Sequence, residues 1–195
     1  GWEAYQRGDL RGAEALLGWA VTQANVPPWV HYALGWSQFA LSEYPAAAAE
    51  WEKVRGRVPE FEPVYFDLAD GYLQVQDYGK ALEVLREAEK RWPKDVEVYN
   101  AIGVVQTGRY ALNDAIKTFE KAVAVKSDDP TANYNLARVC ELRYIQADRL
   151  RSVSRSVTGG FERDKDCALQ YYRRTVEIGG LFVEEATAGL KRLGQ

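Results

Sequence analysis

Apolar positions recur along this chain at a fixed interval, which predicts an array of similar helical hairpins. An alanine is followed four places later by a large apolar residue in three segments, and the alanines are 34 residues apart: Ala47 with Trp51, Ala81 with Leu85 and Ala115 with Phe119. An apolar residue followed by a small one keeps the same step in the preceding segments: Leu34-Gly35, Leu68-Ala69, Ile102-Gly103 and Leu136-Ala137. A constant period of this length is typical of stacked supersecondary repeats.

The spacing within each unit has a direct physical meaning. Residues four apart lie one turn along the same helix face, so the large residue follows its alanine toward the neighbouring unit. A small residue on the first helix lets the second helix approach closely, and Pro59 and Pro93 end the second helices because proline cannot continue them. One hairpin cannot bury its apolar face alone, so neighbouring units must stack.

These residues resemble the tetratricopeptide repeat, which has this length and this small, large, small and proline pattern. The resemblance covers nearly the whole chain and implies an all-α fold, a right-handed α-solenoid that forms a single array over residues 1–195. It implies a partial repeat at 1–27 and full repeats at 28–61, 62–95 and 96–129. Because the chain opens with Gly1-Trp2 and contains no methionine, we expect a piece of a longer protein that begins inside the array.

The pattern breaks in the unit that begins at Pro130. The period requires an alanine at position 149, but the matching Ala168-x3-Tyr172 pattern arrives 19 residues later. We therefore predict an enlarged repeat at 130–179 with an insertion at about 144–166. Its elements are a first helix that continues toward Val157, a break at Gly159-Gly160 and a second helix from about Asp164 to Ile178.

The segment 181–193 predicts a helix that caps the end of the array, which solenoids need to stay soluble. The side chains expected to face the stack are those of Leu181, Val183, Ala186, Leu190 and Leu193.

Charge and cysteine content narrow the functional classes. The net charge is -3 and the sequence pI about 5.4, which gives no overall case for binding nucleic acid. The arginine-rich stretch 143–157 could contact phosphates or an acidic partner, although a solvated helix face is the more frequent origin of such a run.

Cys140 and Cys167 are either two half-buried thiols or a bridge between neighbouring helices. No apolar run approaches the roughly 18 residues that span a bilayer, so we expect no membrane insertion.

Catalytic chemistry has little support in the sequence. His31 is the single histidine and occupies a packing position on a first helix, so we expect it to be partly buried and inert. No nucleophile with a base partner, phosphate-binding loop or metal-ligand motif is visible. The carboxylates are expected on outward helix faces. We therefore predict no enzyme, no cofactor and no metal site.

The resemblance implies that the first helices line an inner, concave surface. The residues that it places there as partner-binding candidates are Trp29, Tyr32, Trp36, Phe39, Phe66, Asp70, Asn100, Tyr134, Asn135 and Arg138. The aromatic set favours a groove for an apolar helix or extended peptide, since exposed aromatic residues often mark interaction sites. The alternative is that some of these rings only fill space between helices.

Polar residues on the first helices indicate how such a groove would bind its ligand. Asn100 and Asn135 lie near positions where family members use asparagine amides against a peptide backbone, and the alternative is an ordinary solvated surface residue. Family members that grip a C-terminal carboxylate need cations on the first helices. The positions in register hold Tyr32, Trp36, Asp67, Glu97 and Ala101, none of which is a cation, so we reject that specialisation.

The sequence therefore predicts a non-catalytic protein-protein interaction module whose partner is a peptide or helix in the concave groove. Trp36, Phe39, Phe66 and Tyr32 would anchor the partner, and Asn135 and Arg138 would orient it. The alternative is a structural spacer or docking domain within a larger protein.

Overall fold

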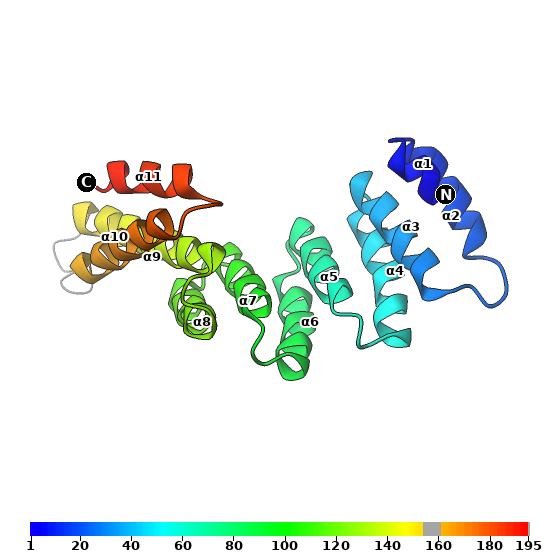
Figure 1. Cartoon of the computed structure of the whole chain (residues 1–195), viewed down its shortest axis with the longest axis horizontal. Helices are drawn as coiled ribbons and strands as arrows, with labels where there is room; N and C mark the ends of the chain where they lie inside the picture. The colour runs from blue at the N-terminus through cyan, green and yellow to red at the C-terminus, as the bar shows by residue number, and fades with distance from the viewer. Residues whose placement is uncertain (154–160, 195) are drawn as a thin grey trace. The chain divides into compact units, whose positions relative to one another are not determined.

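The computed structural model describes residues 1–153 and 161–194, and this part of the chain is helical without any β-strand (Figure 1). The helices are α1 (Trp2–Gln6), α2 (Leu10–Ala20), α3 (Pro28–Ala40), α4 (Tyr44–Arg57), α5 (Pro63–Gln74), α6 (Tyr78–Arg91), α7 (Val96–Gly108), α8 (Leu112–Val125), α9 (Pro130–Val153), α10 (Phe161–Ile178) and α11 (Val183–Arg192). The predicted all-α class is confirmed.

The helices form two compact units, Gly1–Arg91 and Trp92–Gln195. In the first unit, which we call the N-terminal unit, each of α1 to α5 packs against the helix that follows it. In the second, the C-terminal unit, α7 packs against α8, α8 against α9, α9 against α10 and α10 against α11. Packing limited largely to sequence neighbours is what defines an α-solenoid.

The residues that recur every 34 positions meet inside the hairpins. Trp51 is fully buried, and a Cβ atom at Gly35 would lie only 2.3 Å from its Nε1 atom. A Cβ atom at Gly103 would likewise lie 2.5 Å from Phe119, which is also buried. Close approach of the first helix to the second therefore requires glycine at both positions, in agreement with the small residue that the sequence pattern predicts there.

The last hairpin is longer than the others, as predicted. Helix α9 has 24 residues and α10 has 18, whereas α3 to α8 have 12 to 14. Helix α10 begins at Phe161, three residues before the predicted start at Asp164. The predicted continuation to Val157 and the break at Gly159-Gly160 lie outside the described residues.

A disulfide joins Cys140 on α9 to Cys167 on α10, with 6.0 Å between their Cα atoms. Of the two alternatives that the sequence left open, the structure therefore has the bridge. Both residues contact the core of the C-terminal unit, where Cys140 is fully buried. The bridge links the two long helices of the enlarged hairpin.

Helix α11 covers the end of the C-terminal unit, and its Ala186 and the Leu193 that follows it are buried in that core. A Cβ atom at Gly189 would lie 2.5 Å from the buried ring of Tyr172, so α11 approaches α10 closely. The predicted start at residue 181 is wrong, because Phe182 has a positive φ angle that an α-helix does not contain, and α11 begins at the next residue. Leu181 consequently lies outside the helix and is 67% exposed.

Candidate functional site

The predicted partner-binding residues on α3 include Trp29, which was not among the predicted anchors, and the predicted anchors Trp36 and Phe39. Trp29 is 62% exposed. Trp36 and Phe39 are half-buried and pack against the fully buried Trp51, with ring centroids 5.7 and 5.6 Å from it. The space-filling alternative therefore applies to Trp36 and Phe39, because both contribute to the α3–α4 hairpin.

An apolar cavity of about 260 Å³ opens beside Trp29. It lies between the start of α3, the end of α4 and the turn that follows α4, and its lining residues are Pro28, Trp29, Tyr32, Val54, Val58 and Phe61. Phe61 meets Tyr32 edge to face, with 5.0 Å between ring centroids. A cavity of this size can take one apolar side chain of a binding partner.

A tyrosine–aspartate contact connects this cavity to α5. The Tyr32 hydroxyl donates a 2.6 Å hydrogen bond to Asp67 Oδ2. Burial raises the pKa of Asp67 to about 6; the hydrogen bond from Tyr32 opposes this rise, and the nearby charge of Asp70 adds to it. Burial and the same hydrogen bond raise the pKa of Tyr32 to about 12. Asp67 thus has an environment in which its charge is poorly solvated.

Two other predicted residues also lie on α5. Asp70 is exposed and accepts a 3.1 Å hydrogen bond from Gln74 one turn later, and Phe66 is half-buried. Sequence reasoning used Asp67 only to reject a carboxylate-binding site and did not select it as a binding residue. Asp67 and Tyr32 both occupy first-helix positions that the repeat aligns. That alignment is the signal in the sequence that the two side chains lie close together. We call the surface formed by Trp29, Tyr32, Phe66, Asp67 and Asp70 the α3–α5 face.

The remaining predicted site residues lie in the C-terminal unit. A cavity of about 290 Å³ there is lined by Val104, Thr107, Phe119, Tyr134, Asn135, Arg138, Val139 and Leu142. Arg138 is exposed, whereas the Tyr134 ring stacks on Phe182 with 4.5 Å between centroids. Part of the Tyr134 surface is therefore covered by the residue that precedes α11.

Asn100 is only 7% exposed, so it is not the solvated surface residue that the sequence also allowed. The side-chain nitrogen of Asn135 lies 3.5 Å from Oδ1 of Asn100, which is long for a hydrogen bond. The structure brings these two amides together within the C-terminal unit.

The expectation that carboxylates lie on outward faces is wrong at several positions. Glu141 is 4% exposed and accepts hydrogen bonds from the Tyr172 hydroxyl at 2.6 Å and from Arg192 Nε at 2.8 Å. Burial by itself raises the pKa of Glu141, but the bonds from Arg192 and Tyr172 lower it below its ordinary value. A buried carboxylate with these partners anchors α11 to α9 and α10.

Two further carboxylates pair with basic groups. Asp164 is buried and receives the Arg143 guanidinium, whose Nε lies 2.9 Å from Oδ2. The buried His31 places Nδ1 2.6 Å from Glu50 Oε2, which links α3 to α4. His31 therefore has a structural partner rather than the passive packing role expected from sequence.

Within the arginine-rich stretch, Arg143 also donates to Asn113 Oδ1 at 2.8 Å. The side chains of Arg151 and Arg155 lie outside the described residues. Among the residues with described side chains, no three His, Cys, Asp or Glu groups are placed to hold a metal ion. In the same part of the chain, no helix combines the length and apolar character needed to cross a membrane.

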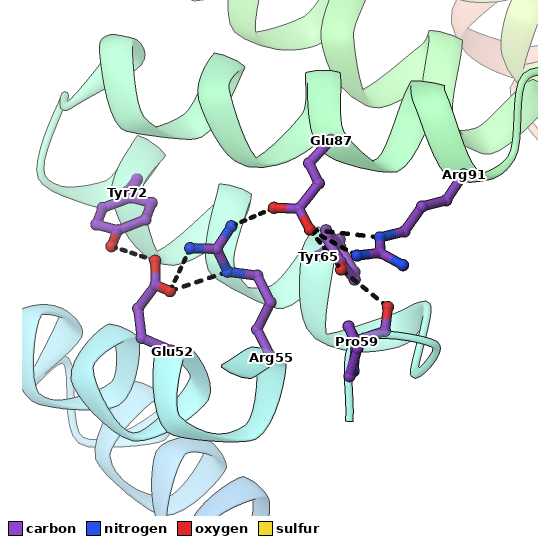
Figure 2. A network of polar contacts seen from close by, with 7 residues as sticks. All are labelled: Glu52, Arg55, Pro59, Tyr65, Tyr72, Glu87 and Arg91. Atoms are coloured by element: carbon purple, nitrogen blue, oxygen red, sulfur yellow. Dashed lines mark hydrogen bonds and ion pairs between the residues drawn. The ribbon is translucent and has the colours of Figure 1, made fainter. Parts of the chain in front are cut away.

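The second helices of the N-terminal unit carry a separate polar network (Figure 2). Arg55 on α4 contacts Glu52 on the same helix and Glu87 on α6, each at 2.6 Å. Tyr72 and Tyr65 on α5 donate to Glu52 at 2.9 Å and to Glu87 at 3.1 Å. The network ties three consecutive helices together and engages the Arg55 cation.

The fold and the paired helices define an α-solenoid of helical hairpins, and comparison with known proteins specifies the family. Two family models, both described as tetratricopeptide repeat, match residues 1–60 and 62–105, which together exceed half of the chain. The chain belongs to the tetratricopeptide repeat family.

A curated relative is the mouse protein "Cell division cycle protein 16 homolog", which is 26% identical over 152 residues. The match covers 70% of this chain but only 24% of that protein's length.

Similar solved structures support the same fold. A fragment of MamA from Desulfovibrio magneticus RS-1 has a TM-score of 0.68 at 21% identity, covering 91% of this chain and 89% of that chain. YrrB, described as a TPR protein with an unusual peptide-binding site, has a TM-score of 0.66 at 15% identity, covering 97% and 87%. PilF of Pseudomonas aeruginosa has a TM-score of 0.66 at 19% identity, covering 99% and 85%.

Proposed function

We propose that the chain is a non-catalytic protein-interaction module that binds a peptide or helical segment of a partner protein on the α3–α5 face. Tetratricopeptide repeats are protein-interaction modules, and the proposal specifies where this one binds. In the C-terminal unit, the exposed Arg138 and its neighbour Asn135 are a separate candidate for polar contacts to a partner.

One observation supports the proposal most strongly, namely the exposed Trp29 side chain beside the apolar cavity. An indole that is largely in water contributes little to the fold of the free protein. When a partner covers it, the same indole contributes a large apolar contact, and aromatic anchors of this kind dominate binding energies at interfaces. Tyr32 forms the next part of the cavity wall, with its hydroxyl fixed on Asp67.

The test is selection from a displayed library of random dodecapeptides on three immobilised proteins: the intact chain, Trp29→Ala and Trp19→Ala. Trp19 is 68% exposed on α2 and does not line the cavity, so its substitution is a matched control for the loss of an exposed indole. Trp36→Ala is a poorer probe, because Trp36 packs against Trp51 and its loss also perturbs the fold.

We expect peptides that are enriched by the intact chain and by Trp19→Ala but bind Trp29→Ala at least about tenfold more weakly, as for a central anchor. Peptides held equally by all three proteins would place the binding surface elsewhere. Enrichment of no peptide at all would contradict the proposal and would favour the spacer role.

A further inference from the structure

We infer that the segment bound on the α3–α5 face is basic: a lysine- or arginine-containing stretch of a partner protein. An apolar side chain of that stretch enters the cavity beside Trp29, and a cationic side chain pairs with Asp67 and Asp70. The inference rests on the proposed function and specifies the chemistry of the partner.

The first observation is the distribution of charge along the N-terminal unit. Residues 21–42, which include α3, contain no Lys, Arg, Asp or Glu. Residues 58–79, which include α5, contain no Lys or Arg but five carboxylates: Glu60, Glu62, Asp67, Asp70 and Asp77. The segments that build the α3–α5 face therefore carry negative charge without any lysine or arginine.

The basic residues of this part of the chain lie on the second helices instead. Residues 43–57, which include α4, contain three basic residues, Lys53, Arg55 and Arg57, and three glutamates. Residues 80–91 of α6 contain four basic residues and three glutamates. Lys53 contacts Glu50 at 2.6 Å, and Arg55 is engaged by Glu52 and Glu87 (Figure 2). Thus the second helices are close to balanced in charge, whereas α5 is acidic and α3 is aromatic and uncharged.

The geometry of Asp67 adds a second and independent observation. Its carboxylate is held in place by the Tyr32 hydroxyl at 2.6 Å, directly beside the wall of the apolar cavity. A carboxylate can accept about four hydrogen bonds, so those from the Tyr32 hydroxyl and the Trp36 side chain leave capacity for an ammonium or guanidinium group. The aromatic ring of Tyr32 also attracts a cation that approaches its face.

The titration of Asp67 agrees with this assignment. Its pKa is raised to about 6 by burial, and the titratable groups beside it are Tyr32, which donates a hydrogen bond, and Asp70, whose charge raises the pKa further. A bound cation would stabilise the ionised carboxylate and lower this pKa. Binding of a basic peptide is therefore expected to strengthen as pH rises from about 5 to 7.

An acidic partner is disfavoured by the same arrangement. Like charges placed together at an interface weaken association and suppress such partners, whereas opposite charges select and steer the correct one. The uncharged α3 surface would accept an apolar segment from a basic or an acidic partner. The aspartates of α5 would therefore discriminate between the two.

The experiment uses the same dodecapeptide selection on the full chain, followed by sequencing and by affinity measurement for the enriched peptides. Affinities are measured for the intact chain, Asp67→Asn, Asp70→Asn and Glu83→Gln, with circular dichroism to verify folding. Asparagine at 67 keeps an oxygen that can accept the Tyr32 hydrogen bond. Glu83 is an exposed carboxylate on α6, away from the face, and serves as the matched charge control.

We expect Trp29-dependent peptides to carry a net positive charge with a lysine or arginine close to an apolar residue. Asp70→Asn should weaken them about threefold, as for an exposed ion pair, and Asp67→Asn about tenfold because its charge is partly desolvated. Glu83→Gln should leave the affinity unchanged.

Two outcomes would overturn the inference, and they can be told apart. In the first, the Trp29-dependent peptides are neutral or acidic, or they bind Asp67→Asn and Asp70→Asn as tightly as the intact chain. This result would refute the basic partner but would be consistent with the proposed function. In the second, no Trp29-dependent peptide is found, which would refute both the basic partner and the proposed function.

Discussion

Two glycines that approach the same tryptophan give opposite predictions for the same substitution. Gly35 on α3 and Gly71 on α5 both lie in helices and are both buried. A Cβ atom at Gly35 would lie 2.3 Å from Nε1 of Trp51, whereas one at Gly71 would lie 3.5 Å from the nearest Trp51 carbon. The first distance is an overlap and the second an ordinary van der Waals contact.

The magnitudes follow from three contributions. Alanine in place of glycine stabilises a helix interior by roughly 0.5–1 kcal/mol, and this gain applies at both positions. At Gly35 the overlap with the fully buried Trp51 costs about 1–3 kcal/mol, because a packed core has little room to shift. Moving the indole also endangers the 3.2 Å hydrogen bond from Trp51 Nε1 to the Tyr32 carbonyl, and an unsatisfied buried donor costs about 1–3 kcal/mol.

We therefore expect Gly35→Ala to lower the free energy of unfolding by about 2 kcal/mol and Gly71→Ala to raise it by about 0.5–1 kcal/mol. The assay is urea unfolding followed by circular dichroism and by tryptophan fluorescence. In thermal unfolding the first change corresponds to a decrease of about 4–8 °C in midpoint. Equal effects of the two substitutions, or a Gly35→Ala protein as stable as the original, would refute this reasoning.

Three further predictions concern charge and covalent bonding. Because the pKa of Asp67 is raised to about 6 in the folded state, its contribution to stability is complete below its unfolded pKa near 4 and is lost as pH rises through about 6. The chain should lose about 1 kcal/mol relative to Asp67→Asn across this range, after allowance for solvent screening, and a pH-independent difference in urea midpoints would contradict this. Arg192→Ala should destabilise the C-terminal unit by about 1–2 kcal/mol, since it leaves the buried Glu141 with one partner fewer, and hydrogen exchange of α11 should accelerate; unchanged exchange would count against the anchor. Reduction of the Cys140–Cys167 bridge, which closes a separation of 27 residues, should cost about 3 kcal/mol, and dithiothreitol should leave the melting of a Cys140→Ala/Cys167→Ala variant unaffected.

The fold was largely predictable because its determinants are local and repeated. Each alanine and the large residue one turn later report on a contact inside one hairpin, so the pattern alone located α3 to α8. The close approach of Gly35 to Trp51 and of Gly103 to Phe119 is the physical origin of that pattern.

The features that were missed depend on contacts between residues far apart in sequence. Nothing near Glu141 indicates that Arg192, 51 residues later, reaches it and makes a buried carboxylate tolerable. The start of α11 was placed too early because the positive φ angle of Phe182 has no counterpart in an apolar pattern.

The candidate site was predicted in part. Repeat position predicted that Tyr32 and residues of α5 share one surface, and Tyr32 does contact Asp67 of α5. It could not separate the exposed Trp29 from Trp36, which packs on Trp51. Both residues have the same type and lie seven positions apart on one helix. Which of them faces solvent depends on the α4 side chains packed beneath them, and these are not specified by the repeat.

The most direct test of the central claim is photo-crosslinking from the α3–α5 face in cells that produce the protein. The photoreactive amino acid p-benzoylphenylalanine is placed at position 29 in one variant and at position 19 in another, since both tryptophans are exposed. We predict a partner protein crosslinked from position 29 alone, through a segment that contains lysine or arginine. A partner crosslinked only from position 19, or from neither position, would contradict it.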